Sequence, residues 1–191
     1  SARLRGLAQV EAVSLGPRVL RADTAAAAAL TVLATSLPGL LVGWELMGAA
    51  SYALIGYRYA DPGRVASGAT AFLTTRAADL GLYLATAAAL AGGTDLSLDA
   101  LAGIEGGWRD VAAAGVLVAA LGKAAQLPFS FWLSGAMEGP SPVSALLHSA
   151  AMVAMGGYLL LRTEPLLAST SWAAPAAAWV GALTALLLGA V

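Results

Sequence analysis

One lysine interrupts a long stretch of the sequence that carries no other charge. Lys123 lies in the segment Val111–Met137, and Pro128 follows it five residues later. A prolyl ring inside a helix removes a backbone donor and clashes with the preceding turn, so we expect a helix break between Gly122 and Pro128. The break would free a carbonyl near Ala124 beside the ammonium. A cation beside a broken helix can hold charge partway across a membrane, where only protein or water satisfies the backbone.

Further ionisable residues lie in other apolar stretches: Glu45, the pair Arg76 and Asp79, and His148. A carboxylate or ammonium at the centre of a bilayer costs about 2.5–3.5 kcal/mol, so each of these groups needs a partner or a use. The structural alternative is that Glu45 forms a buried ion pair with Lys123 that only fixes helix packing. In the same alternative, Arg76 pairs with Asp79, three residues later on one helical face.

The same residues have the chemistry of a proton relay. His148 is the only histidine, which excludes a metal site built from several histidines. Imidazole titrates near neutral pH, which suits proton transfer, and a buried core histidine is the alternative. A carboxylate that moves relative to Lys123 would switch the lysine between holding and releasing its proton. The set therefore predicts proton transfer, and no grouping of a nucleophile with a base indicates hydrolysis.

The composition predicts a membrane protein. The chain has 191 residues, of which 59% are hydrophobic and 11% are charged, with a mean hydropathy of +0.78, whereas soluble domains carry about 25% charged residues. Its 10 basic and 11 acidic residues are scattered, which argues against a nucleic-acid surface. Without cysteine there is no thiolate for a metal or an iron–sulfur cluster, and no phosphate-binding glycine motif occurs. We expect no cofactor in this chain and no signal peptide at its start.

Apolar stretches of about twenty residues, each long enough to cross a bilayer, divide the chain into about six spans. We expect an all-α bundle that crosses the membrane repeatedly, with one span broken near its middle and a polar loop over Gly92–Asp110. Residues 1–20 are left unassigned. The predicted spans are Arg21–Leu37, a second that starts at the turn Pro38-Gly39 and ends at Tyr57, Val65–Ala91, the broken span Val111–Met137, Pro140–Leu161 and Trp172–Val191.

Loop charge predicts the orientation of these spans. Arginines occur in the stretch 18–21 before the first span and in the loop 58–64 after the second, and two crossings place both on one side. The positive-inside rule makes that side the cytoplasm. The acidic loop 92–110 then lies on the opposite side. Arg162 would lie on that outer side too, against the rule.

Four motifs within residues 40–162 are long enough to indicate a family. They are Gly43-Trp44-Glu45-Leu46-Met47-Gly48 with Ser51-Tyr52-Ala53-Leu54-Ile55-Gly56; Ala71-Phe72-Leu73-Thr74-Thr75-Arg76-Ala77-Ala78-Asp79-Leu80-Gly81; Gly122-Lys123-Ala124-Ala125-Gln126-Leu127-Pro128; and the run from Ala136 to Ser149. In this order they resemble the fifth, sixth, broken seventh and eighth helices of the antiporter-like subunits of complex I, the proton-pumping NADH:quinone oxidoreductase. The second motif is similar to the L-type subunit, or chain 5, in particular. Ala78 stands where the family usually has glycine.

The resemblance implies a fold and a role for each ionisable residue. It implies about fourteen core helices with two inverted five-helix repeats, of which this chain carries the first. Glu45 and Lys123 would form the conserved pair of the first half-channel, with His148 passing protons toward the membrane centre. Asp79 and Arg76 would tune that pair.

The resemblance also implies domains and partners. Residues 21–162 would form the five-helix half-channel repeat, and 163–191 the truncated first helix of the next repeat. The partners would be the other membrane and redox subunits of complex I, the rest of its own subunit, and lipid. NADH, flavin, iron–sulfur clusters and quinone are expected in those partners, so the chain is not catalytic alone. The expected location is the inner membrane of a bacterium.

Two other interpretations remain open at this point. One is a cation/proton antiporter, or an inorganic-carbon uptake subunit, of the same superfamily. The other is a structural membrane scaffold with inert ion pairs. The motif Thr74–Gly81 favours complex I over the antiporters, and the spread of charges over four helices disfavours a scaffold.

Overall fold

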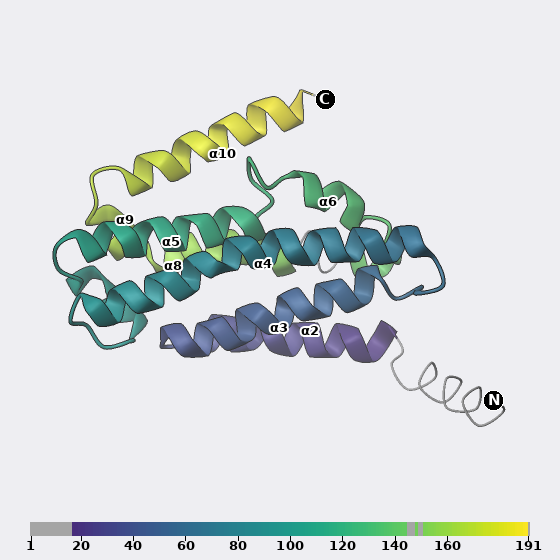
Figure 1. The fold of residues 1–191 in the computed structure, drawn as a ribbon, viewed down its shortest axis with the longest axis horizontal. Helices are drawn as coiled ribbons and strands as arrows, with labels where there is room; N and C mark the ends of the chain where they lie inside the picture. The colour runs from purple at the N-terminus through teal and green to yellow at the C-terminus, as the bar shows by residue number, and fades with distance from the viewer. Residues whose placement is uncertain (1–16, 145–147, 149–150, 191) are drawn as a thin grey trace.

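The computed structural model describes residues 17–144, 148 and 151–190. These residues are mostly helical, and the predicted all-α class is confirmed (Figure 1). Most of the segment 1–20 and part of the predicted span Pro140–Leu161 lie outside the described residues. The elements are α2 (Pro17–Leu33), α3 (Leu37–Ile55), α4 (Pro62–Ala91), the 3-10 helix η1 (Leu98–Gly103), α5 (Gly107–Lys123), α6 (Phe131–Ala136), α7 (Ser141–Ser144), α8 (Met152–Arg162), α9 (Glu164–Ala168) and α10 (Ala173–Gly189).

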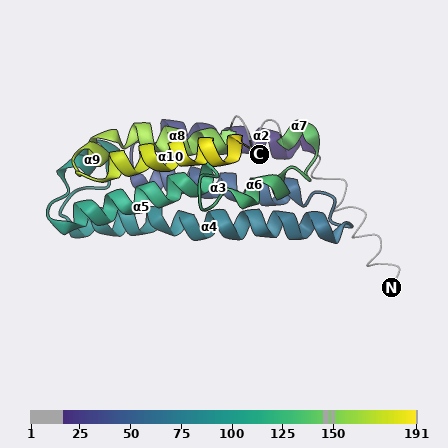
Figure 2. The ribbon, with the colours of Figure 1, turned by 90° about the horizontal axis from the view of Figure 1, so that it is seen from above.

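The long helices run back and forth between two ends of an elongated bundle (Figure 1, Figure 2). Helix α4 has 30 residues, a length of about 45 Å, and it packs beside α5 and then beside α6, which follows α5 after a break. Helices α2 and α3 pack together, and α3 also contacts α4. Among the described helices, α3 alone has the length and hydropathy to cross a membrane, while α8 and α10 are apolar but shorter.

Two predicted boundaries were wrong by a few residues. The turn between the first two helices lies before Leu37, because Ser36 caps α3 by accepting a hydrogen bond from the Gly39 amide at 3.4 Å. Pro38 therefore lies in the first turn of α3, where proline is well tolerated, and not in the turn itself. Helix α5 begins at Gly107, so the end of the predicted polar loop forms its first turn, with Asp110 at the positive end of the helix dipole.

Polar contacts tie the connections together at each end of the bundle. At one end, Arg162 forms an ion pair with Asp99 at 3.1 Å, so the arginine that departs from the loop-charge rule is matched by an acidic residue of the loop 92–110. At the other end, Asp61 caps α4 and accepts a hydrogen bond from Arg64 at 3.1 Å. This hydrogen bond holds the pKa of the Asp61 carboxyl below its usual value.

Helices α4 and α5 approach each other closely where two glycines meet. A Cβ atom built on Gly81 would collide with the backbone carbonyl of Gly115, and one built on Gly115 would collide with the carbonyl of Gly81. Farther along the same interface, a Cβ on Gly122 would collide with the methyl group of Ala78. Small residues at such positions let membrane helices pack backbone to backbone. This close packing fixes the position of Lys123, at the end of α5, relative to α4.

Replacing Gly81 by alanine should destabilise the complete subunit, because the new methyl group forces the α4 and α5 backbones apart. Overpacking of this kind costs about 1–3 kcal/mol. The measurements are the unfolding stability of the purified subunit in detergent and the amount of subunit found in membranes. Gly157→Ala is the matched control, since a Cβ there meets no atom within 4 Å. Equal stability of the two variants would contradict the close crossing.

Candidate functional site

The site lies where α5 ends. Helix α5 stops at Lys123, and Ala125 has a φ of 50°, a left-handed conformation that ends helices. The predicted break between Gly122 and Pro128 is therefore present, and it begins directly after Lys123. Leu127, directly before the proline, is also disfavoured in helical conformation. The backbone turns away from the helix directly after Lys123 and resumes helical form at Phe131.

Side chains satisfy the backbone groups that the break leaves open. The Ala124 carbonyl accepts a hydrogen bond from the side-chain amide of Gln126 at 3.1 Å. The Gly122 carbonyl accepts one from the Trp132 indole at 3.0 Å. The prediction of a free carbonyl near Ala124 beside the ammonium was thus wrong, because the side chain of Gln126, two residues later, reaches it.

The α10 helix contributes a further contact to the break. The Leu127 amide donates a hydrogen bond to the Thr184 hydroxyl at 3.2 Å, and that hydroxyl donates to the Val180 carbonyl at 2.7 Å. Thr184 is the only residue of α10 with a polar side chain apart from its tryptophan. In an apolar environment an open amide is costly, so this contact stabilises the break.

Lys123, the only lysine of the chain, is fully buried and pairs with a buried carboxylate. Its Nζ lies 2.8 Å from Oδ2 of Asp79 on α4, and the side chains are 0% and 1% exposed. The position at the last residue of α5 favours a cation, because the helix dipole is negative at that end. Gly48 of α3 leaves room for the ammonium, since a Cβ there would lie 3.1 Å from Nζ.

A tryptophan of α3 completes the surroundings of this ion pair. Trp44 is fully buried, and its Nε1 donates a hydrogen bond to Oδ1 of Asp79 at 2.7 Å. The ring also lies close to the ammonium of Lys123, with Nζ 5.5 Å from the ring centroid, a distance at which cation–π attraction acts. Both oxygens of the Asp79 carboxylate therefore have donors.

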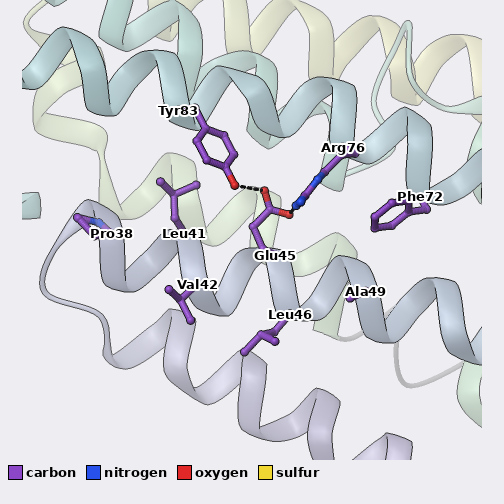
Figure 3. A pocket seen from close by; sticks show the side chains of 9 residues that line it. All are labelled: Pro38, Leu41, Val42, Glu45, Leu46, Ala49, Phe72, Arg76 and Tyr83. Carbon is purple, nitrogen blue, oxygen red and sulfur yellow. Dashed lines mark hydrogen bonds and ion pairs between the residues drawn. The ribbon is translucent and has the colours of Figure 1, made fainter.

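The second ion pair joins Glu45 of α3 to Arg76 of α4 (Figure 3). The other carboxylate oxygen of Glu45 accepts a hydrogen bond from the Tyr83 hydroxyl at 2.9 Å. Arg76 and Tyr83 are seven residues apart, two helical turns, so both point from the same face of α4 toward Glu45. The Arg76 guanidinium also lies 5.7 Å from the ring centre of Phe72.

This second pair borders an open groove, unlike the first. The groove has a volume of about 550 Å³, and the Arg76 and Glu45 side chains are 44% and 16% exposed. Apolar side chains of α3 and α4 form most of its wall, as Figure 3 shows. The lining residues are Pro38, Leu41, Val42, Glu45, Leu46, Ala49, Phe72, Arg76 and Tyr83.

The structure brings four of the predicted site residues together but pairs them differently from the prediction. Among the described residues, Lys123 pairs with Asp79 and not with Glu45, and Arg76 pairs with Glu45 and not with Asp79. The reason is the direction of each side chain. Asp79 points toward α5, while Arg76, one turn earlier on α4, points toward the open side of α3. Sequence spacing shows which residues share a helix but not which neighbour each one faces.

His148 is buried away from both ion pairs and contacts α3. Its Nε2 and the Ser51 hydroxyl oxygen are 3.0 Å apart, a hydrogen bond whose direction depends on the tautomer. Its ring and that of Trp132 form a T-shaped contact, with ring centroids 6.0 Å apart. Because Trp132 also donates to the Gly122 carbonyl, one tryptophan connects His148 to the last turn of α5, next to Lys123.

Four contact residues of the site were not singled out from the sequence: Trp44, Ser51, Tyr83 and Trp132. A signal existed for two of them. Trp44 is adjacent to Glu45, and Tyr83 follows Asp79 by one helical turn. Within the described residues, no group of three or more His, Cys, Asp or Glu side chains lies close enough to hold a metal ion.

A buried ion pair beside a broken helix in an apolar bundle is typical of membrane proteins that carry ions. Residues 34–191 match the family model described as "NADH:quinone oxidoreductase/Mrp antiporter, TM". The chain belongs to this family of transmembrane proteins.

Several named proteins are similar to the chain. It is 42% identical over 166 residues to NADH-quinone oxidoreductase subunit L of Mycobacterium tuberculosis (strain ATCC 25618 / H37Rv), covering 85% of this chain and 26% of that protein. It is 41% identical over 147 residues to NADH-ubiquinone oxidoreductase chain 5 of Pelomedusa subrufa, covering 77% of this chain and 24% of that protein. The chain thus spans about a quarter of the length of these relatives.

A solved structure has the same fold. The structure of the Mrp complex from Dietzia sp. DQ12-45-1b contains a chain that matches with a TM-score of 0.71 and 35% identity. The match covers 80% of this chain and 17% of that one. The fold is therefore that of an antiporter-like membrane protein, and this chain corresponds to a part of it.

The pairing of Lys123 with Asp79 can be tested by a double-mutant cycle in the complete subunit. Lys123→Met and Asp79→Asn should each lower stability by about 3–5 kcal/mol, because each leaves a buried charge without its partner. The double variant should lose much less than the sum. Stability is measured by unfolding of the purified subunit. The control is the combination of Lys123→Met with Glu45→Gln, whose two stability losses should be closer to additive. Additivity for the Lys123 and Asp79 variants would contradict the ion pair.

Proposed function

We propose that the chain is part of an L-type, proton-translocating membrane subunit of a respiratory NADH:quinone oxidoreductase. The observation that carries the proposal is the fully buried ion pair of Lys123 and Asp79, 2.8 Å apart at the end of α5. A lysine in this position is costly in a membrane and is expected where a proton is held and released. The similarity to subunit L of Mycobacterium tuberculosis and to chain 5 of Pelomedusa subrufa supports the assignment to this complex.

In this proposal Lys123 is the group that holds the proton. While Asp79 is 2.8 Å away, its negative charge favours the ammonium form. Movement of the carboxylate away from Nζ would leave the ammonium unpaired in an apolar site, which favours release of the proton. The pair of Glu45 and Arg76 shares helix α4 with this pair, where it would tune it and provide a second carboxylate for the incoming proton.

His148 would receive the proton on its way to the membrane centre. Trp132 lies between the last turn of α5 and the imidazole, and because an indole N–H only donates, the proposed transfer from Lys123 to His148 would pass through water beside this ring. Ser51 holds the imidazole at its Nε2, 3.0 Å away. This contact fixes the ring orientation, as neighbours of functional histidines commonly do.

We also infer the wider architecture from the resemblance. Six spans would cross the inner membrane of a bacterium, residues 21–162 forming the first inverted repeat of about fourteen core helices and 163–191 beginning the next. The partners are the rest of the same subunit, further membrane subunits, and redox subunits that hold the flavin, iron–sulfur clusters and quinone. Support comes from the half-exposed Arg76, because an arginine facing lipid costs about 2.5–3.5 kcal/mol and is better covered by protein.

The second candidate function is a subunit of an Mrp-type cation/proton antiporter. It is favoured by the structural match to the Mrp complex from Dietzia sp. DQ12-45-1b at 35% identity. Both functions use the same buried groups, so the site does not distinguish them. Proton transport by the reconstituted complete complex, driven by NADH oxidation or by a sodium gradient, separates the two.

Lys123→Ala in the complete complex should abolish most proton transfer through this subunit, measured per assembled subunit because the same change lowers its stability. A proton without an acceptor at mid-membrane faces about 2.5–3.5 kcal/mol more, roughly a hundredfold in rate. Protons pumped per electron are measured in vesicles. Arg162→Ala is the control, because it removes a cation from an ion pair of 3.1 Å at one end of the bundle. Normal pumping by Lys123→Ala would contradict the role of the lysine.

The orientation can be tested with single cysteines in a cysteine-free background. Cysteine at Gly63, beside the arginine-containing loop, should be protected from an impermeant maleimide added outside intact cells. Cysteine at Gly103, in the acidic loop, should be labelled, and the nearest atom to a Cβ there is 3.7 Å away. Labelling at Gly63 alone would invert the proposed orientation.

A further inference from the structure

We propose that Trp44 is a positioning residue of the relay, which holds Asp79 on Lys123 and keeps it away from Arg76. The inference rests on the proposed function, since it concerns the same ion pair. Its basis is the division of one carboxylate between two donors. Oδ1 of Asp79 accepts from the Trp44 indole at 2.7 Å, and Oδ2 accepts from Lys123 at 2.8 Å.

Arg76 is the competitor for this carboxylate. It lies three residues before Asp79 on α4, the spacing at which helical side chains of opposite charge pair with each other. In the structure Arg76 instead pairs with Glu45, the residue that follows Trp44 on α3. Two consecutive residues of α3 therefore hold two residues of α4 that are one turn apart. Trp44 donates a hydrogen bond to Asp79, and Glu45 forms an ion pair with Arg76.

The indole is suited to this task because it is a donor without charge. Trp44 is fully buried, so a charged donor in its place would need a further counter-ion. The N–H occupies Oδ1 and leaves the net charge of the site unchanged. The ring meanwhile faces the ammonium, with Nζ 5.5 Å from its centroid, so Trp44 contacts both members of the ion pair.

Without the indole N–H, Oδ1 of Asp79 is left without a donor in a buried site, which is unfavourable. Arg76 can then supply the missing donor by turning from Glu45 to Asp79. That exchange weakens the hold of Asp79 on Lys123 and leaves Glu45 with the Tyr83 hydroxyl as its remaining partner. Hydrogen bonds to charged groups shift such equilibria by about tenfold or more.

Two replacements of Trp44 separate the hydrogen bond from the packing. Phenylalanine keeps a six-membered ring in the site but has no donor. Histidine loses more volume, but its five-membered ring superposes on the pyrrole part of the indole and places an Nε2–H where Nε1–H was. If the hydrogen bond matters, Trp44→His retains more function than Trp44→Phe. If only packing matters, the order is reversed.

The experiment measures protons pumped per electron in vesicles that contain the complete complex, together with the amount of assembled subunit. Trp44→Phe is expected to lose more than half of the pumping, and Trp44→His to recover part of it. The matched control is Trp172→Phe, which removes an indole–carboxylate hydrogen bond of the same length, 2.7 Å to Asp110, at an exposed position. This control should pump normally.

Three results would overturn the inference. The first two are that Trp44→Phe pumps as well as the control, or that it pumps better than Trp44→His. The third is that both Trp44 variants are lost from the membrane, which would assign the residue a packing role. Lys123→Ala measured in parallel keeps the two proposals distinct. If Lys123→Ala pumps normally, the proposed function fails. If it does not pump while Trp44→Phe equals the control, only the role of Trp44 fails.

Discussion

An ammonium group buried in an apolar bundle needs a counter-charge, and the arrangement of the helices around Lys123 meets that need. Asp79 supplies the charge at 2.8 Å from α4. The small residues along α4 and α5 bring the two backbones close enough for this contact, and Gly48 leaves the space that the ammonium fills. Ala78 fits against α5 because Gly122 opposite it has no side chain. Residues of three helices, α3, α4 and α5, therefore make room for the Lys123 ammonium or supply its counter-charge.

The break after Lys123 sets a second constraint, because an interrupted helix leaves amides and carbonyls without partners. Gln126 and Trp132 satisfy carbonyls at 3.1 and 3.0 Å. Thr184 satisfies an amide from α10, a helix that otherwise contacts the bundle sparsely. Three side chains therefore form hydrogen bonds with the backbone of the break. A break satisfied in this way keeps Lys123 at a defined place at the end of α5.

The all-α class and the ionisable residues of the site could be predicted from the sequence, whereas the short helices η1 and α9 could not. Apolar length and punctuation predicted the helices, and Lys123 with Pro128 predicted a break in the right segment. The partners of the ionisable groups were not predictable, because they depend on how each helix is rotated about its axis and on which neighbour it meets. Glu45 and Lys123 were expected to pair, yet Trp44 and Glu45 point to different partners although they are adjacent. The left-handed conformation of Ala125 within the break was not predictable either, since alanine has no residue-type signal for it.

The two ion pairs differ in a way that bears on how a proton would move between them. The pair of Lys123 and Asp79 is closed on all sides, whereas the pair of Glu45 and Arg76 borders a groove and is partly exposed. Replacing a closed pair by apolar residues of similar volume is often neutral or stabilising, so burial of the first pair is not explained by stability alone. One pair is partly exposed, the other is buried, and each uses a residue of α4, which are features that the proposed switching of Lys123 would need. In the proposed relay, the partly exposed pair would meet protons first, and the buried pair would retain one only while Asp79 contacts Lys123.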